Sequence, residues 1–96
     1  VQQVMVDTGL MSWADVAGRM STRPARIGRV DGHGRGLEVG APANVTLVDP
    51  STTWTVDPHA LASKSSNTPY RRMTLPGSVY ATFLRGNATV LDGKLA

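Results

Sequence analysis

The sequence has 96 residues, which allows one small domain at most, and its lack of cysteine excludes a disulfide framework and a thiolate metal site. No apolar run is long enough to cross a bilayer, so we expect no membrane partner and a cytoplasmic protein. The net charge of +3 is scattered along the chain, which argues against nucleic acid as a partner.

Helical patterns occupy the first 27 residues. Val1, Val4 and Met5 follow helical spacing, and Thr8-Gly9 supplies a stop signal. Ser12, with an acidic residue three positions later, predicts a capping box at the start of a second helix.

One apolar face marks this second helix, formed by Trp13, Val16, Ala17 and Met20. We expect the helix to end at Ser21-Thr22. Thr22 is then predicted to cap a short third helix, with Pro24 in its first turn.

After the glycine-rich loop 32–36, the pattern changes to short strands. We expect strands at 45–49, ending before Pro50, at 53–56, at 78–84 and at 89–91. Asp57-Pro58 predicts a helical turn over 59–62, and 64–74 is predicted to be irregular. Hairpin turns are expected at 85–87 and at Asp92-Gly93.

The predicted fold class is therefore α+β, with helices first and a small sheet after them. We expect residues 1–30 to form terminal helices and residues 31–96 to form part of a β-sandwich-like unit. So few strands leave an apolar face and free edges that need a partner.

The candidates for chemistry are few and dispersed. His33 and His59 are far apart, and neither has a neighbour at metal-ligand spacing. Ser63-Lys64 does not form the S-x-x-K pattern of a serine acylase. The acidic residues sit where caps and turns prefer them: Asp7, Asp15, Asp31, Glu38, Asp49, Asp57 and Asp92. We therefore expect no catalytic, cofactor-binding or metal-binding residue in this chain.

A different class of function is kept as an alternative. Residues 14–30 could form a basic helix-turn-helix that binds nucleic acid, with Arg23, Arg26 and Arg29 on its second helix. Against this, the junction at Ser21-Thr22 lacks the usual glycine.

Two stretches resemble the end of many amidohydrolase-superfamily enzymes. Residues 21–28 are similar to a short helix with an N-P-A core, and residues 36–49 to G-x-L/I-x-x-G-x-x-A-D-L-V-L-x-D. Arg23 stands in place of the asparagine and Asn44 in place of the aspartate, changes that affect packing and capping.

A narrower signal lies further along the chain. Residues 63–70 read S-K-S-S-N-T-P-Y, which resembles the S-K-S-x-N-T-P-F segment of dihydroorotases with Tyr70 at the aromatic position. Residues 75–86 resemble the ending of the same family. Arg72 occupies a position where glycine is common.

The resemblance implies the C-terminal segment of a dihydroorotase, which interconverts dihydroorotate and N-carbamoyl-L-aspartate in pyrimidine biosynthesis. It implies a zinc-dependent TIM-barrel enzyme whose ligands and catalytic aspartate lie upstream of Val1, so no site residue is carried over. The implied partner is the N-terminal barrel portion, against which Asn67-Thr68-Pro69-Tyr70 is expected to fasten the small sheet. A homo-oligomer is left open.

Overall fold

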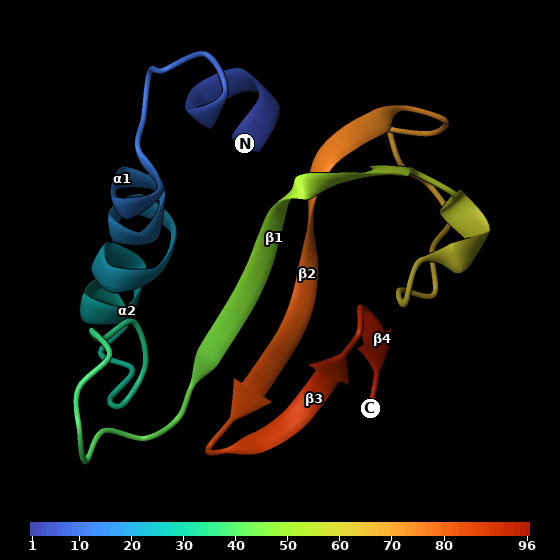
Figure 1. The fold of residues 1–96 in the computed structure, drawn as a ribbon. Coiled ribbons are helices and arrows are strands. Elements are labelled where there is room, and N and C mark those ends of the chain that lie inside the picture. The colour runs from blue at the N-terminus through green and yellow to red at the C-terminus, as the bar shows by residue number, and fades with distance from the viewer.

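The computed structural model describes residues 1–96, which form a helical layer beside a four-stranded antiparallel sheet (Figure 1). The strands lie in the order β1-β2-β3-β4. Their bounds are β1 Val45–Thr55, β2 Thr74–Leu84, β3 Asn87–Leu91 and β4 Lys94–Leu95. The helical elements are η1 Gln2–Val6, α1 Trp13–Ala17, η2 Gly18–Thr22, α2 Arg23–Ile27 and η3 Pro58–Ala60.

The predicted capping box is present at the start of α1. The Asp15 N–H donates to Ser12 Oγ at 3.1 Å, and the Ser12 N–H donates to Asp15 Oδ2 at 3.0 Å. Hydrogen bonds from the Ser12 backbone and hydroxyl lower the pKa of Asp15 because they favour the charged carboxylate. The start of this helix is therefore fixed by interactions within one turn.

The expected break at Ser21-Thr22 is wrong, because α1, η2 and α2 form one continuous helical run. Thr22 has helical dihedrals (φ −64°, ψ −50°) and makes no capping hydrogen bond. The middle of the run widens to a π-helical turn, in which the Arg23 N–H donates to Gly18 O. Such a turn accommodates Pro24, which lacks an N–H and whose ring would crowd a regular α-helical turn.

Strand β1 joins two strands that the sequence predicts as separate. It runs through Pro50 because the register shifts between Asp49 and Thr53, so the proline lies in an irregularity at the sheet edge. The Asp49 carboxylate accepts hydrogen bonds from the Ser51 N–H at 2.9 Å and the Ser51 hydroxyl at 2.6 Å. Strand β2 likewise begins before the expected residue 78, at Thr74.

Both hairpin turns are two-residue turns with positive φ at each central residue, as a type I′ turn requires. Arg85 (φ 51°) and Gly86 (φ 81°) join β2 to β3, where Leu84 pairs with Asn87. Asp92 (φ 50°) and Gly93 (φ 73°) join β3 to β4. The predicted turns are confirmed, the first being one residue shorter than expected.

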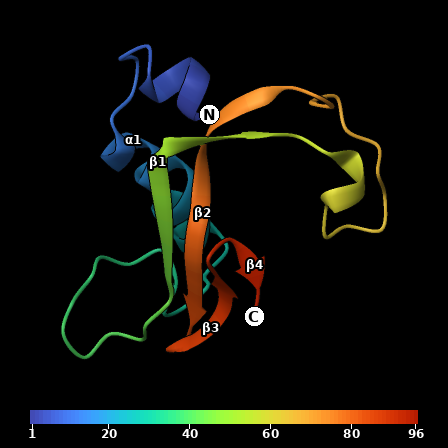
Figure 2. The same ribbon diagram turned by 45° about the vertical axis from the view of Figure 1, so that its right-hand side comes forward.

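The turn at Arg72 forms without the glycine common in the family pattern. Arg72 has φ 63°, and its N–H donates to Val56 O at 2.9 Å. The Val56 N–H donates in return to Met73 O at 2.9 Å. These reciprocal bonds close the base of the segment between β1 and β2, which projects away from the sheet in Figure 2.

The chain has almost no core. Only Val56 and Ala81 are buried, at 4% and 1% exposure. Nineteen large hydrophobic side chains are exposed, on the helices and on the sheet alike. The α+β class is confirmed, and both layers present apolar surface to their surroundings.

Candidate functional site

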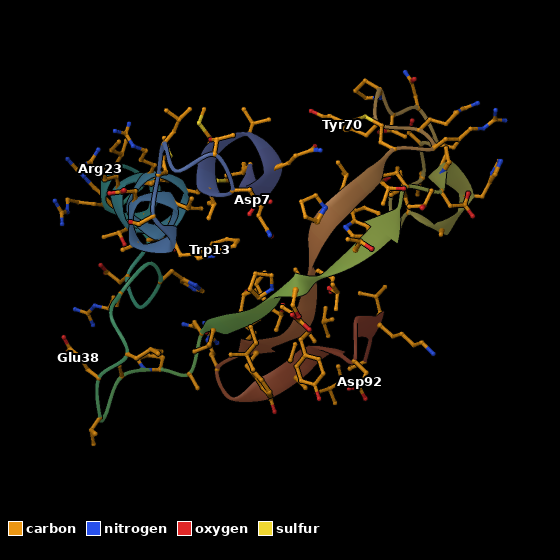
Figure 3. All side chains as sticks on the ribbon, turned by 45° about the horizontal axis from the view of Figure 1, so that its top comes forward. Asp7, Trp13, Arg23, Glu38, Tyr70 and Asp92 are labelled. Atoms are coloured by element: carbon orange, nitrogen blue, oxygen red, sulfur yellow. The ribbon has the colours of Figure 1, made fainter.

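The largest concave feature is a groove of about 770 Å³ between the helical layer and the sheet, here called the interlayer groove. One wall carries Trp13, Val16 and Met20 from the helical run. The opposite side is built from residues of β1, β2 and the β3–β4 turn: Val48, Asp49, Thr52, Trp54, Pro76, Gly77, Ser78, Val79, Tyr80, Asp92 and Gly93. Figure 3 shows Trp13 directed toward the sheet and Arg23 on the other side of the helical layer.

The two layers meet at one end of this groove, where η1 contacts β2. Gln2 and Val1 line the groove there, and the Gln2 side-chain amide donates to Pro50 O at 3.0 Å. Gly77 lies beside the same amide and has φ 81°. A sequence pattern gives no signal for this contact, because it joins residues 48 positions apart.

Two carboxylates supply the charge in the groove. The Ser51 hydroxyl and N–H lower the pKa of Asp49, because both stabilise its ionised form. The nearby Asp92 carboxylate, as a hydrogen-bond acceptor and as a negative charge, raises the pKa of the Tyr80 phenol. Both shifts favour a negative charge on Asp49 and a neutral Tyr80 phenol beside Asp92.

At the opposite end of the structure, the Asn44 side chain connects two loops. Its Nδ2 donates to Gly32 O at 2.7 Å, and its Oδ1 accepts from the Arg85 N–H at 2.9 Å. The Gly86 N–H donates to Ala43 O at 3.0 Å beside it. Asn44 therefore joins the glycine-rich loop to the β2–β3 turn, and it needs a donor and an acceptor on one side chain.

We expect Asn44→Asp to destabilise the protein although the family pattern carries aspartate there. A carboxylate accepts from Arg85 but cannot donate to Gly32 O, so one hydrogen bond is lost and two oxygens face each other. The expected loss is about 1–3 kcal/mol in the free energy of unfolding. Urea unfolding of the longer polypeptide that contains this chain measures it. An Asn44→Asp variant as stable as the parent contradicts the role of Asn44 as both donor and acceptor.

The candidate catalytic residues are not brought together. His33 lies half-buried in the turn after the helical run, and His59 is exposed in η3. No group of three or more histidine, aspartate or glutamate side chains could hold a metal ion. Nothing in this chain therefore fits a metal site, and the prediction that its catalytic and metal residues lie elsewhere stays a prediction.

The segment 63–70 is held by short polar side chains. The Tyr70 N–H donates to Thr68 Oγ1 at 3.2 Å, and the Asn67 N–H donates to Ser65 Oγ at 3.1 Å. Tyr70 itself is 56% exposed, and Figure 3 places it on the segment that projects beyond the sheet. Its ring is therefore available for a contact outside this chain.

The helix-turn-helix alternative is wrong. That motif requires two helices that cross at about 90–120° around a turn, whereas residues 13–27 form one continuous run. No helix is long and apolar enough to span a membrane.

The fold places the chain in a known class. No family model matches it. A dihydropyrimidinase structure from Brevibacillus agri superimposes with a TM-score of 0.84 at 24% identity, covering 96% of this chain and 20% of that one. A D-hydantoinase structure gives 0.83 at 25% identity, covering 95% and 20%. The fold is that of the C-terminal part of these amidohydrolase-superfamily enzymes.

Sequence comparison finds similar segments in curated dihydroorotases. The dihydroorotase of Streptomyces coelicolor is 58% identical over 99% of this chain, that of Mycobacterium tuberculosis is 56% identical over 99%, and that of Mycobacterium leprae is 60% identical over 98%. The chain matches one segment of these dihydroorotases along nearly its whole length, and it spans about 22% of the length of these curated relatives.

Proposed function

We propose that this chain is a non-catalytic structural segment of a dihydroorotase that acts in pyrimidine biosynthesis in the cytoplasm. The whole enzyme adds water across the ring amide of dihydroorotate. The carbonyl carbon becomes a carboxylate and the ring nitrogen becomes the carbamoyl amide of N-carbamoyl-L-aspartate. One observation carries the proposal: a chain that matches dihydroorotases along its whole length buries only two of its residues.

The structural role follows from the exposed apolar surface. Burial of apolar surface stabilises by about 25 cal/mol per Å², and this chain leaves large side chains of both layers in solvent. Residues 1–30 pack on the barrel in the remaining polypeptide, and residues 31–96 complete a composite β-sandwich. Strand β1, an 11-residue strand at the edge of the sheet, offers free backbone groups for pairing.

Zinc belongs to the remaining polypeptide in this proposal. When bound there, it supplies an activated water for attack on the ring carbonyl. No three acids or histidines of this chain lie close enough together to hold a metal ion, so the proposal assigns it no part of that site. Their contribution is to keep the remaining polypeptide folded.

We expect the isolated chain to bind no zinc tightly and to hydrolyse no dihydroorotate, whereas the longer polypeptide does both. Elemental analysis after dialysis and the consumption of dihydroorotate test the two statements on both proteins. One zinc per isolated chain, or turnover by it, overturns the non-catalytic assignment. A folded, metal-loaded longer polypeptide that leaves dihydroorotate intact overturns the assignment of the reaction.

A further inference from the structure

The charged side chains that line the interlayer groove are all acidic, although the chain as a whole is basic. Of the sixteen lining residues, only Asp49 and Asp92 carry a charged side chain. The chain has ten lysine and arginine residues, and none of them lines the groove. The groove therefore repels anions and favours a cation with apolar surroundings.

One carboxylate oxygen of Asp49, Oδ2, is available to accept a hydrogen bond from a ligand. Its Oδ1 accepts both hydrogen bonds from Ser51, at 2.9 Å and 2.6 Å, and no side-chain hydrogen bond of the chain reaches Oδ2. The residue is half-buried where β1 bends at its irregularity. A cationic donor at Oδ2 forms a charge-assisted hydrogen bond, which is about twice as strong as a neutral one.

The backbone of Asp92 is held in a tight turn. It occupies a hairpin turn with φ 50°, and the Gly93 N–H beside it donates to Tyr80 O at 3.0 Å. The carboxylate lies near the Tyr80 phenol and raises the pKa of that group. The turn therefore fixes the backbone from which the Asp92 carboxylate reaches the groove.

We propose that the interlayer groove binds an apolar segment of the remaining polypeptide that carries a lysine or arginine, whose cation lies against Asp49 and Asp92. The inference rests on the proposed function, which makes this chain part of a longer polypeptide. In the curated relatives, about four fifths of each chain lies outside the matched region, which is long enough to contain such a segment. Trp13 and Trp54, 41% and 42% exposed, provide apolar faces for the stem of such a side chain.

The first experiment asks whether the groove is filled in the longer polypeptide. This chain contains no cysteine, so Val79→Cys places a single thiol of similar size in the groove, and Val39→Cys places one in an exposed loop. We expect iodoacetamide to modify the Val79→Cys thiol at least about tenfold more slowly, because reaction requires local opening. Peptide mass spectrometry reads each site. Equal rates mean an empty groove and overturn the inference.

The second experiment tests the charge. Asp49→Asn and Asp92→Asn keep the hydrogen-bond acceptors, and asparagine tolerates the left-handed backbone at position 92. Combined with Val79→Cys, the double asparagine variant should be modified faster than its parent. Glu38→Gln, an exposed acid outside the groove, is the matched control and should leave the rate unchanged. An unchanged rate in the double variant removes the cation from the proposal.

Two further measurements distinguish the remaining explanations: the effect of dilution and the rate of dihydroorotate hydrolysis. If protection of the Val79→Cys thiol disappears on dilution as the mass falls to that of a monomer, a second copy fills the groove and the proposed occupant is wrong. Dihydroorotate hydrolysis is measured on the same samples. Loss of protection with normal hydrolysis overturns the groove alone, and protection without any hydrolysis in the parent overturns the assigned reaction alone.

Discussion

Tyr70→Ala should destabilise the longer polypeptide by about 2–4 kcal/mol, the effect of removing a large buried side chain. In this chain the ring is 56% exposed at the end of a segment that projects from the sheet. An aromatic ring with a polar tip suits a half-buried boundary. We therefore expect the ring to be covered by the barrel and to fasten the small sheet to it.

The conformation of the segment supports such a contact. Pro69 fixes its own φ and restricts Thr68 to extended backbone. The Thr68 hydroxyl then accepts from the Tyr70 N–H at 3.2 Å. The ring is thus presented from a stiffened backbone, which lowers the entropy lost when it docks.

The measurement is the melting temperature of the longer polypeptide, together with its kinetics. Activity should fall with the amount of folded protein, and the Michaelis constant of the folded fraction should stay the same. Tyr70→Phe is the matched control and should retain most of the stability, since it keeps the ring. An unchanged melting temperature in Tyr70→Ala would mean that the segment is a surface loop without a docking role.

Local signals in the sequence were reliable where a single turn decides the structure. Ser12 and Asp15 predicted a capping box, and both of its hydrogen bonds are present. Asp92-Gly93 predicted a hairpin turn, and both residues have positive φ. Each of these features depends on residues within four positions of one another, so its signal can be read without knowledge of distant contacts.

The errors arose where the backbone had an unusual way to accommodate proline. The sequence predicts a helix boundary just before Pro24, but a π-helical turn continues the helical run past this residue. Pro50 was read as the end of a strand, but an irregular register keeps it within β1. Sequence periodicity assumes one regular turn or ladder, so it does not predict these local changes of geometry.

The candidate site could not be predicted from the sequence. The interlayer groove combines residues from Val1 to Gly93, and only the fold brings them together. The family pattern indicates only that Asn44 affects packing and capping, yet its amide joins Gly32 to Arg85 across 12 and 41 positions. The resemblance to dihydroorotases was visible because it rests on short contiguous motifs, which survive without knowledge of the fold.

The second large loss of stability is expected from a substitution at Gly34, in the glycine-rich loop 32–36. This glycine has φ 63°, and a Cβ built on it would lie 2.7 Å from the Ala25 Cβ and 2.7 Å from the Ser21 carbonyl oxygen. The loop therefore lies directly on the helical run, and neither neighbour is a flexible side-chain end that could move aside.

Gly34→Ala should destabilise the longer polypeptide by about 2–5 kcal/mol. The left-handed backbone accounts for about 1–2 kcal/mol, and the steric conflict with the helix for about 1–3 kcal/mol. Gly40→Ala separates the two causes, since Gly40 has φ 86° with nothing near its Cβ position, and should lose only the first part. Gly36→Ala, with open space and no positive φ, should be neutral or stabilising by about 0.4–1 kcal/mol. Urea unfolding of the three variants gives the order, and a Gly34→Ala loss no larger than that of Gly40→Ala would show that the loop does not rest on the helix in the longer polypeptide.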